Sequence, residues 1–593
     1  MLAENSQKSL VSGALLVALV SAVFFLGLSF NRGLEMSDEG AYLLVASDPW
    51  FSAAHGSFYG FALFPLWELA CKSLAGFRWV GLLVWLLVCL YLSLGLRQAL
   101  AGFLGRERST IPGFWVAGSL LLASLSLYSD GIRTPNYNWL AHVGAALLLG
   151  SFFRGARIQG KAPTCLTVFL GVVGWVALAA GRWSSALTLL PLLAWGAWFV
   201  PQPGPARIWL IRVLGWTIPT LILAGYFYVG PDSLKAGWWS AKLIFAQTKS
   251  HGWWLVGQYG LNFLYYLYRV ARAAIWIVPL VVIFWSLSRV PRFQNVFGSR
   301  LIPWVCLAAV VLALIRGYWK GGAENFSKES VLAGLWLGSL AWIGWRSGEW
   351  RSVLPGMGWW VGLCAALPWL LGLATDTSLA DYAGHGTVFS AAAGWLLLAP
   401  MAVDKKNISV AGALILSLGL LQATRAASST IFSYRIGNVW NLDSRIGAGP
   451  ENGRIIVDAS TADLVRRLDA AMRTGGFQAG DSIVALTDMP GLVYLLGGKS
   501  PGVPWYFGMS PRLAGPNGEF TRFVLESLPA TTLEGSWILY RQKTSIPRDL
   551  RRIWPLEKAG LPRDTALEIP WDTHFYPKER VHLYAPFKSR DKG

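Results

Sequence analysis

The sequence predicts an all-α polytopic membrane protein with about 13 transmembrane helices, followed by a C-terminal α/β extracytoplasmic domain. The 593-residue chain is 54% hydrophobic and 14% charged, whereas an ordinary soluble domain carries about 25% charged residues. Apolar runs recur along the first 424 residues, and Lys and Arg gather in alternate loops between them. This composition excludes a large soluble enzyme, a disordered scaffold and a disulfide-framed secreted domain.

Each apolar run is long enough, or nearly so, to cross a hydrocarbon core of about 30 Å. We interpret the first run as a helix and not as a signal peptide, because it is long, has only Lys8 before it and lacks a small-residue cleavage site. The predicted spans are 10–30, 77–96, 113–128, 138–153, 164–181, 184–200, 208–229, 265–288, 301–316, 329–345, 354–374, 388–403 and 408–424.

The distribution of Lys and Arg predicts which way the spans run. With a cytoplasmic N-terminus, the inner loops hold 16 basic and 4 acidic residues, against 13 basic and 11 acidic in the rest of the chain before residue 425. This asymmetry follows the positive-inside rule. We therefore predict a multi-pass protein of a bacterial-type inner (plasma) membrane, with the C-terminal domain outside. Most of the net charge of +19 is thus an orientation signal and not a nucleic-acid footprint.

The C-terminal part of the chain has a different, more polar character. Strands are predicted at 454–459, 482–488 and 536–541, with helices at 461–476 and 489–498 between them. Alternating strands and helices indicate a small α/β domain. We place the domain boundary between a transmembrane domain, residues 1–430, and an extracytoplasmic domain, residues 431–593.

The first outer loop carries adjacent carboxylates, Asp38 and Glu39, just beyond the first helix. His55 begins the segment HGSFYGFALFPLW, which is suited to the membrane surface and makes His55 a candidate for substrate contact. The alternative is that the two acids are ordinary solvated loop charges.

The second outer loop, YSDGIRTPNYNW (128–139), places an acid, a base and an amide-rich helix start together. Asp130, Arg133, Tyr137 and Asn138 are therefore either ligands of a sugar phosphate or parts of a capped helical hairpin. Arg182 lies in the very short link between two predicted spans. An arginine there either snorkels to the interface or binds a lipid phosphate, which its planar fork fits.

A further outer segment, RGYWKGGAENFSKES (316–330), adds Arg316 and Lys320 as further substrate-binding candidates. No Walker loop, strand-linked GxGxxG, HExxH or nucleophile elbow is found, which disfavours nucleotide-driven transport. Scattered outer cations disfavour nucleic acid as a partner. The five Cys lie in or beside apolar runs, so they indicate neither a disulfide framework nor a zinc cluster.

Three segments resemble the GT-C membrane glycosyltransferases, especially the protein-mannosyltransferase-related bacterial family with its aminoarabinose and Rgt-type transferases. They are SDEGAY (37–42), PNYNWL (135–140) and GRWSSAL (181–187). The resemblance implies that Asp38 is the catalytic carboxylate, with Glu39 beside it and Asp130 as a second carboxylate. Where the family often has Lys before helix six, this chain has Arg182. The segment HGSFYG lacks the Lys of the aminoarabinose transferases, which speaks against lipid A as acceptor.

The resemblance also implies a hexosyl or pentosyl transferase that uses a polyprenyl-phosphate sugar and inverts the anomeric centre. Asp38 would act as general base, and Arg182, with Arg133 or Arg316, would neutralise the departing phosphate. A glycan, lipid or protein is the acceptor and membrane lipid surrounds the enzyme. No cofactor is required, and a divalent metal held by the acids is left open.

Two functions of other classes stand beside this one. A transporter or flippase of a lipid-linked glycan should show internal repeats and broken helices with charge at the midplane. The ionisable residues gather instead at one face, which favours the enzyme. A non-catalytic membrane scaffold with an outer binding domain would leave Asp38 and Asp130 without a common task.

Overall fold

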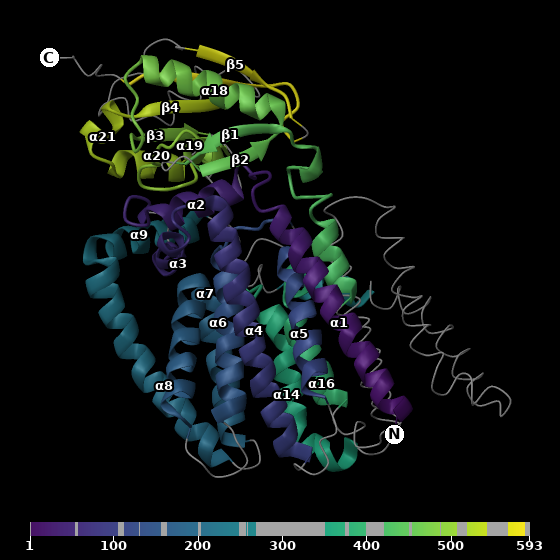
Figure 1. The fold of residues 1–593 in the computed structure, drawn as a ribbon. Helices are drawn as coiled ribbons and strands as arrows, with labels where there is room; N and C mark the ends of the chain where they lie inside the picture. The colour runs from purple at the N-terminus through teal and green to yellow at the C-terminus, as the bar shows by residue number, and fades with distance from the viewer. Residues whose placement is uncertain are drawn as a thin grey trace.

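In the computed structural model, a bundle of long helices is covered at one end by an α/β unit (Figure 1). The structure describes residues 2–53, 57–104, 112–129, 131–155, 163–199, 203–247, 257, 259–268, 350–373, 379–398, 420–449, 453–486, 488–506, 519–542, 567–573 and 575–586.

The bundle is built from apolar helices. They are α1 (Leu2–Leu28), α4 (Leu74–Leu104), α5 (Gly113–Ser124) with η2 (Leu125–Tyr128), α6 (Tyr137–Gly155), α7 (Cys165–Phe199), α8 (Pro203–Leu223) with η3 (Ala224–Val229), α14 (Trp350–Leu370), α15 (Leu379–His385) and α16 (Thr387–Leu398). Within the described residues, three stretches are long and apolar enough to cross a membrane: Leu74–Phe103, Cys165–Trp198 and Gly204–Val229. Large apolar side chains on these helices point outward, such as Trp216 with 66% exposure, as expected of surfaces that face lipid.

The long helix α7 is broken at Arg182, whose φ of −149° and ψ of 89° are not helical. Before the break, Gly181 lies against the first turn of α6 and Gly174 against the middle of that helix. After the break, Gly196 lies against Trp359, which also packs near the end of α6. Gly174, before the break, and Gly196, after it, therefore both lie closer to the carboxyl end of α6 than Gly181 does. The chain turns back at Arg182, as the sequence predicts from the two runs 164–181 and 184–200.

Two short helices, α2 (Asp38–Ser47) and α3 (Tyr59–Leu69), lie between the bundle and the α/β unit (Figure 1). Helix α9 (Pro231–Gln247) lies at the same end of the bundle (Figure 1). The carboxylates in the first turn of α2 are favourable there, because the amino end of a helix carries partial positive charge.

The α/β unit contains a four-stranded sheet of order β3-β4-β6-β5, in which only the β3–β4 pair is parallel. A separate hairpin pairs β1 with β2. Helix α18 buries one face, with Leu464, Leu468 and Met472 four residues apart. The elements are η7 (Val439–Asn441), β1 (Ser444–Ala448), β2 (Gly453–Val457), α18 (Ala459–Thr474), β3 (Ile483–Leu486), α19 (Pro490–Leu495), α20 (Glu519–Ser527), α21 (Ala530–Glu534), β4 (Trp537–Gln542), β5 (Leu567–Trp571) and β6 (Glu579–Tyr584).

The α/β unit is docked directly on α2 through two glycines. Gly491 in α19 donates its N–H to the carbonyl of Met36 at 2.7 Å, and a Cβ on Gly40 would clash with the backbone of Gly491. Only residues without a side chain permit this approach.

Further contacts hold the α/β unit against the first loop. Ile456 in β2 exchanges backbone hydrogen bonds with Asn31 and Gly33 at 2.9 and 2.8 Å. Lys499 forms an ion pair with Asp48, at the end of α2, at 2.7 Å. The loop that carries Asp38 is thus fixed from above by the C-terminal part of the chain.

Most predicted elements within the described residues are present. The runs 10–30, 77–96, 113–128, 138–153, 208–229, 354–374 and 388–403 coincide with α1, α4, α5 with η2, α6, α8 with η3, α14 and α16. The predicted C-terminal strands are β2, β3 and β4, and the predicted helices are α18 and α19, whereas β1, β5 and β6 were not predicted. The runs 265–288, 301–316, 329–345 and 408–424 lie wholly or mostly outside the described residues. The count of thirteen spans and the domain boundary therefore stay predictions.

Candidate functional site

Asp38 and Glu39 are neighbours in α2, but their carboxylates have different surroundings. Successive residues of a helix point about 100° apart. The Asp38 side chain keeps 21% of its surface exposed, whereas Glu39 is buried within the protein. The two acids therefore cannot be assigned the same role.

The carboxylate of Glu39 is bound on both oxygens inside the protein. Arg78 of α4 approaches its Oε2 with Nη2 at 2.8 Å and donates Nε–H to its Oε1 at 3.2 Å. Thr134 donates its backbone N–H and its hydroxyl to the same Oε1, and Glu35 donates its N–H to Oε2. Burial alone would raise the pKa of Glu39, but the attraction of Arg78 and the Thr134 hydrogen bond outweigh it and lower that pKa. Glu39 thus braces the loop and lies away from solvent.

Asp38 faces a cluster of three tyrosines from three helices. Tyr42 lies one turn further along α2, Tyr59 begins α3, and Tyr137 begins α6. Their ring centroids are 6.1 Å apart for Tyr42 and Tyr59, 5.7 Å for Tyr42 and Tyr137, and 5.8 Å for Tyr59 and Tyr137. Burial, with added repulsion from Tyr137 and the Asp38 carboxylate, raises the pKa of both Tyr42 and Tyr59 well above 10. These phenols stay protonated and can donate hydrogen bonds at any physiological pH.

Arg182 lies against Tyr137, one member of this tyrosine cluster. Its guanidinium is 5.0 Å from the ring centroid of Tyr137 and 4.5 Å from that of Tyr382, on α15. Its Nε–H donates to Oδ1 of Asn138 at 3.0 Å, and Nη2 donates to the same oxygen. Contact with two aromatic rings orients the planar guanidinium fork. The break in α7 therefore places a cation beside the start of α6.

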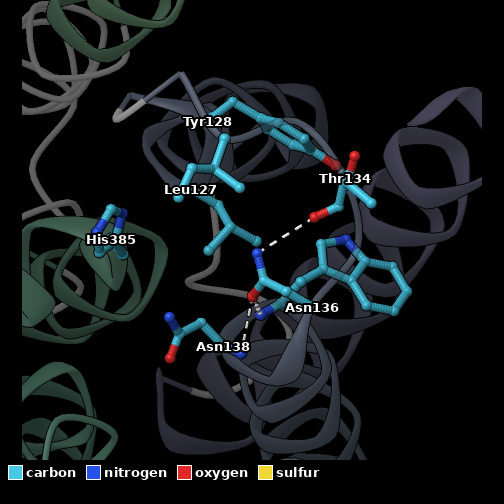
Figure 2. A pocket seen from close by; sticks show the side chains of 8 residues that line it. Leu127, Tyr128, Thr134, Asn136, Asn138 and His385 are labelled. Atoms are coloured by element: carbon cyan, nitrogen blue, oxygen red, sulfur yellow. Dashed lines mark hydrogen bonds between the residues drawn. The ribbon is translucent and has the colours of Figure 1, made fainter. Parts of the chain in front are cut away.

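A small pocket adjoins Asn138 at the start of α6 (Figure 2). Asn136 begins the helix: its Oδ1 accepts from the N–H groups of Asn138 and Trp139, and its Nδ2 donates to the carbonyl of Thr134. Figure 2 shows His385, on another helix, across the pocket from Asn136. The predicted amide-rich helix start is thus an N-cap whose second amide, Asn138, holds Arg182.

Arg133 is buried and takes part in the packing of the second loop. Its guanidinium donates to the carbonyl of Arg32 at 3.1 Å and to Oγ of Ser433 at 3.3 Å. These bonds join the first two loops to the segment that leads into the α/β unit.

The structure brings four of the predicted site residues to one place: Asp38, Tyr137, Asn138 and Arg182. Four others lie outside the described residues: His55, Asp130, Arg316 and Lys320.

Four more residues of the site were not singled out from the sequence: Arg78, Tyr42, Tyr59 and Tyr382. Arg78 had a signal, because it is a charged residue inside a predicted span and such residues need a partner. Tyr42 had a weaker one, since it lies four residues after Asp38 and so shares its helix face.

The described carboxylates near Asp38 do not provide a metal site. Glu39 is neutralised by Arg78, and Oε1 of Glu35 accepts from Ser37 and faces Arg435. In the part of the chain that the structure describes, no group of three or more His, Cys, Asp or Glu could hold a metal ion.

No known family model matches the chain, and no curated protein matches it significantly in sequence. In overall fold it is similar to ArnT from Cupriavidus metallidurans bound to undecaprenyl phosphate, with 11% identity, a TM-score of 0.39, and coverage of 96% of this chain and 98% of ArnT.

The Archaeoglobus fulgidus oligosaccharyltransferase is also similar in overall fold. Its complex with Zn and sulfate has 12% identity and a TM-score of 0.43, over 89% of this chain and 67% of the other. Its form tethered with an acceptor peptide containing the NVT sequon has 12% identity and a TM-score of 0.45, over 90% and 69%. Similarity at this level concerns the general course of the chain and does not extend to individual side chains.

Proposed function

We propose that the protein is a membrane glycosyltransferase that moves a sugar from a polyprenyl-phosphate donor to an acceptor hydroxyl. One observation carries the proposal: a partly exposed carboxylate, Asp38, and a guanidinium, Arg182, both face the tyrosine cluster at one end of an apolar helix bundle. Transfer of a sugar from a lipid phosphate requires a base that activates the acceptor hydroxyl on one side of the anomeric carbon. It also requires a cation that stabilises the leaving phosphate on the other side.

The proposed reaction is a single inverting displacement. The acceptor hydroxyl gives its proton to the Asp38 carboxylate while its oxygen forms a bond to the anomeric carbon. The bond between that carbon and the phosphate oxygen breaks, and the lipid phosphate leaves with the electron pair. Arg182 offsets the negative charge that develops on the leaving phosphate, and its fork fits phosphate oxygens.

The other candidate residues have distinct places in this proposal. Glu39 and Arg133 hold the first two loops together, because their charged groups are buried and bonded to the protein. Tyr137 and Asn138 orient Arg182. The proposal also includes a second carboxylate, Asp130. Its further substrate contacts are His55, Arg316 and Lys320.

The membrane placement is part of the same proposal. The apolar bundle accommodates the polyprenyl tail, and Asp38 lies at the end covered by the α/β unit, which we place outside a bacterial-type inner membrane with a cytoplasmic N-terminus. The segments SDEGAY, PNYNWL and GRWSSAL support the assignment, since each carries or borders one of the grouped residues. The acceptor hydroxyl belongs to a glycan, a lipid or a protein.

The deciding experiment is Asp38→Asn in purified protein with a polyprenyl-phosphate sugar and acceptor. Loss of a general base should lower transfer by at least about 100-fold. Asp48→Asn is the matched control, because Asp48 directly follows the same helix, has 26% side-chain exposure and forms an ion pair with Lys499. Near-normal transfer by Asp38→Asn would refute the catalytic assignment. Transfer in detergent, without any gradient, separates this function from a transporter or flippase.

A further inference from the structure

One arginine of the C-terminal part of the chain reaches the site. Arg435 lies in the tight turn that Ser433 and Gly437 close with two backbone hydrogen bonds, and its own φ is +56°. A non-glycine residue in this left-handed region is uncommon and costs conformational energy. The turn therefore holds Arg435 in a defined place at the junction between the bundle and the α/β unit.

The guanidinium of Arg435 is held between aromatic rings and aimed at the amino end of α2. It lies 4.6 Å from the ring centroid of Tyr434 and 4.8 Å from that of Phe575, in the β5–β6 connection. Its Nη1 is 3.7 Å from Oδ2 of Asp38, and its side chain keeps 27% of its surface exposed. The α/β unit thus supplies both the cation and one of the rings that orient it.

Arg435 also faces the two other polar groups beside Asp38. Its Nη1 is 3.5 Å from Oε1 of Glu35 and donates to Oγ of Ser37. Glu35 is buried, so its charge is poorly screened and repels that of Asp38. Arg435 opposes this repulsion, because Arg78 is already engaged by Glu39.

We propose that Arg435 is a positioning residue, through which the α/β unit keeps the Asp38 carboxylate ionised and oriented for its work as a base. The proposal rests on the function proposed above and adds to it a task for the C-terminal part of the chain. The docking of that unit is secured separately by Gly40 with Gly491 and by the backbone hydrogen bonds of Ile456 with Asn31 and Gly33. Arg435 can therefore be changed without removing the contacts that hold the two parts together.

The charged and titratable groups that face Asp38 come from several elements. Among the described residues they include Glu35 in the preceding loop, Glu39 and Tyr42 on α2, Tyr59 on α3, Tyr137 on α6 and Arg435 from the C-terminal part. The tyrosines are neutral, and the charge of Glu39 is matched by Arg78. Removing Arg435 should therefore make the Asp38 carboxylate harder to ionise, because the cation 3.7 Å from its Oδ2 is lost.

The test compares Arg435→Gln with the control Lys499→Gln, which also removes a cation of the α/β unit paired with an α2 carboxylate. The acid limb of the pH–transfer profile should move up by about one pH unit in Arg435→Gln and stay in place in the control. Arg435→Lys should restore most of the wild-type profile. An unchanged acid limb in Arg435→Gln would overturn the proposal.

A second measurement does not need activity. Carbodiimide couples an amine to protonated carboxyls, and mass spectrometry reports the extent at Asp38 as a function of pH. The midpoint should rise by about one unit in Arg435→Gln and not in Lys499→Gln. If wild-type protein transfers no sugar but the midpoint still rises, the proposed function fails and the link from Arg435 to Asp38 stands. If transfer depends on Asp38 but neither curve moves, the role of Arg435 alone is refuted.

If Arg435→Gln does not fold, Phe575→Leu provides a second test. Phe575→Leu removes one ring beside the guanidinium and keeps the charge, so it should give a smaller shift in the same direction. The absence of any shift in a folded Phe575→Leu, together with normal transfer, would count against the orientation of Arg435 as the cause.

Discussion

Glu39 and Arg78 form an ion pair with almost no contact with solvent, since their side chains are 1% and 0% exposed. Arg78 uses its remaining donors on the carbonyls of Phe30 and Gly33, at 2.7 and 2.8 Å. The pair therefore joins the end of the first helix, the first outer loop and α4 at one point. Because Asp38 directly precedes Glu39 in the chain, this ion pair also fixes the position of Asp38.

Replacing Glu39 with Gln should destabilise the protein strongly. The amide keeps the shape but leaves the guanidinium of Arg78 buried without a counter-charge, which costs about 3–5 kcal/mol. The control is Glu68→Gln, because Glu68 pairs with Lys72 at 3.6 Å where both side chains are well exposed. That loss should stay below about 1 kcal/mol. Denaturant titration in detergent measures both free energies of unfolding, and equal losses would contradict the assigned role.

The same pair should make stability depend on pH in the acid range. The pKa of Glu39 in the folded protein is lowered from its usual 4.5, because Arg78 and Thr134 outweigh the effect of burial. A lowered carboxyl pKa stabilises the fold above the unfolded value, and this contribution is lost as the pH falls through the folded value. The difference in unfolding free energy between wild type and Glu39→Gln should therefore be constant down to about pH 4.5 and shrink below it. A difference that vanished already near pH 6 would show that another group is responsible.

The sequence predicts the helices well and the site only in part. Apolar runs locate α4, α6 and α8 because burial in lipid or protein requires continuous apolar surface, and the charged residue between two runs locates the turn at Arg182. The pairing of Glu39 with Arg78 could not be predicted, because it depends on how α2 packs against α4. The sequence places Glu39 beside Asp38 along the chain, whereas adjacent helix residues point in different directions, so the burial of Glu39 depends on the packing of α2.

Contacts between distant parts of the chain were beyond prediction for the same reason. Nothing in the sequence around Arg435 indicates that it meets Asp38, since the two are brought together only by the docking of the α/β unit. Tyr382 and Tyr59 likewise join the site through the packing of α15 and α3. Sequence pattern reports the face that an element buries and does not report its partner.

The close approach of α2 and α19 should not tolerate a methyl group. Gly40→Ala places its Cβ against the backbone of Gly491, which cannot move as a flexible side chain would. We expect a loss of about 1–3 kcal/mol in stability, with faster proteolysis of the α/β unit. Gly447→Ala is the matched control, because a Cβ there meets no atom within 4 Å. Equal protease sensitivity of the two variants would show that this contact does not hold the unit in place.

Arg182 offers the sharpest test of the phosphate side of the site. The break in α7 and the adjacent rings of Tyr137 and Tyr382 orient the guanidinium of Arg182. Arg182→Gln should therefore lower kcat/KM for the lipid donor by about 10- to 100-fold, the contribution of one or two charged hydrogen bonds. Arg182→Lys should recover only part of this, because an ammonium lacks the planar fork that binds two phosphate oxygens at once.

The control is Arg207→Gln. Arg207 also stacks on a ring, that of Trp198, but donates to carbonyls at the opposite end of the bundle. It should leave donor kinetics unchanged. Steady-state kinetics with a varied donor and a saturating acceptor decide the matter. If kcat/KM for Arg182→Gln stays within about twofold of wild type, the phosphate must be held elsewhere, and Arg182 serves only to close the turn.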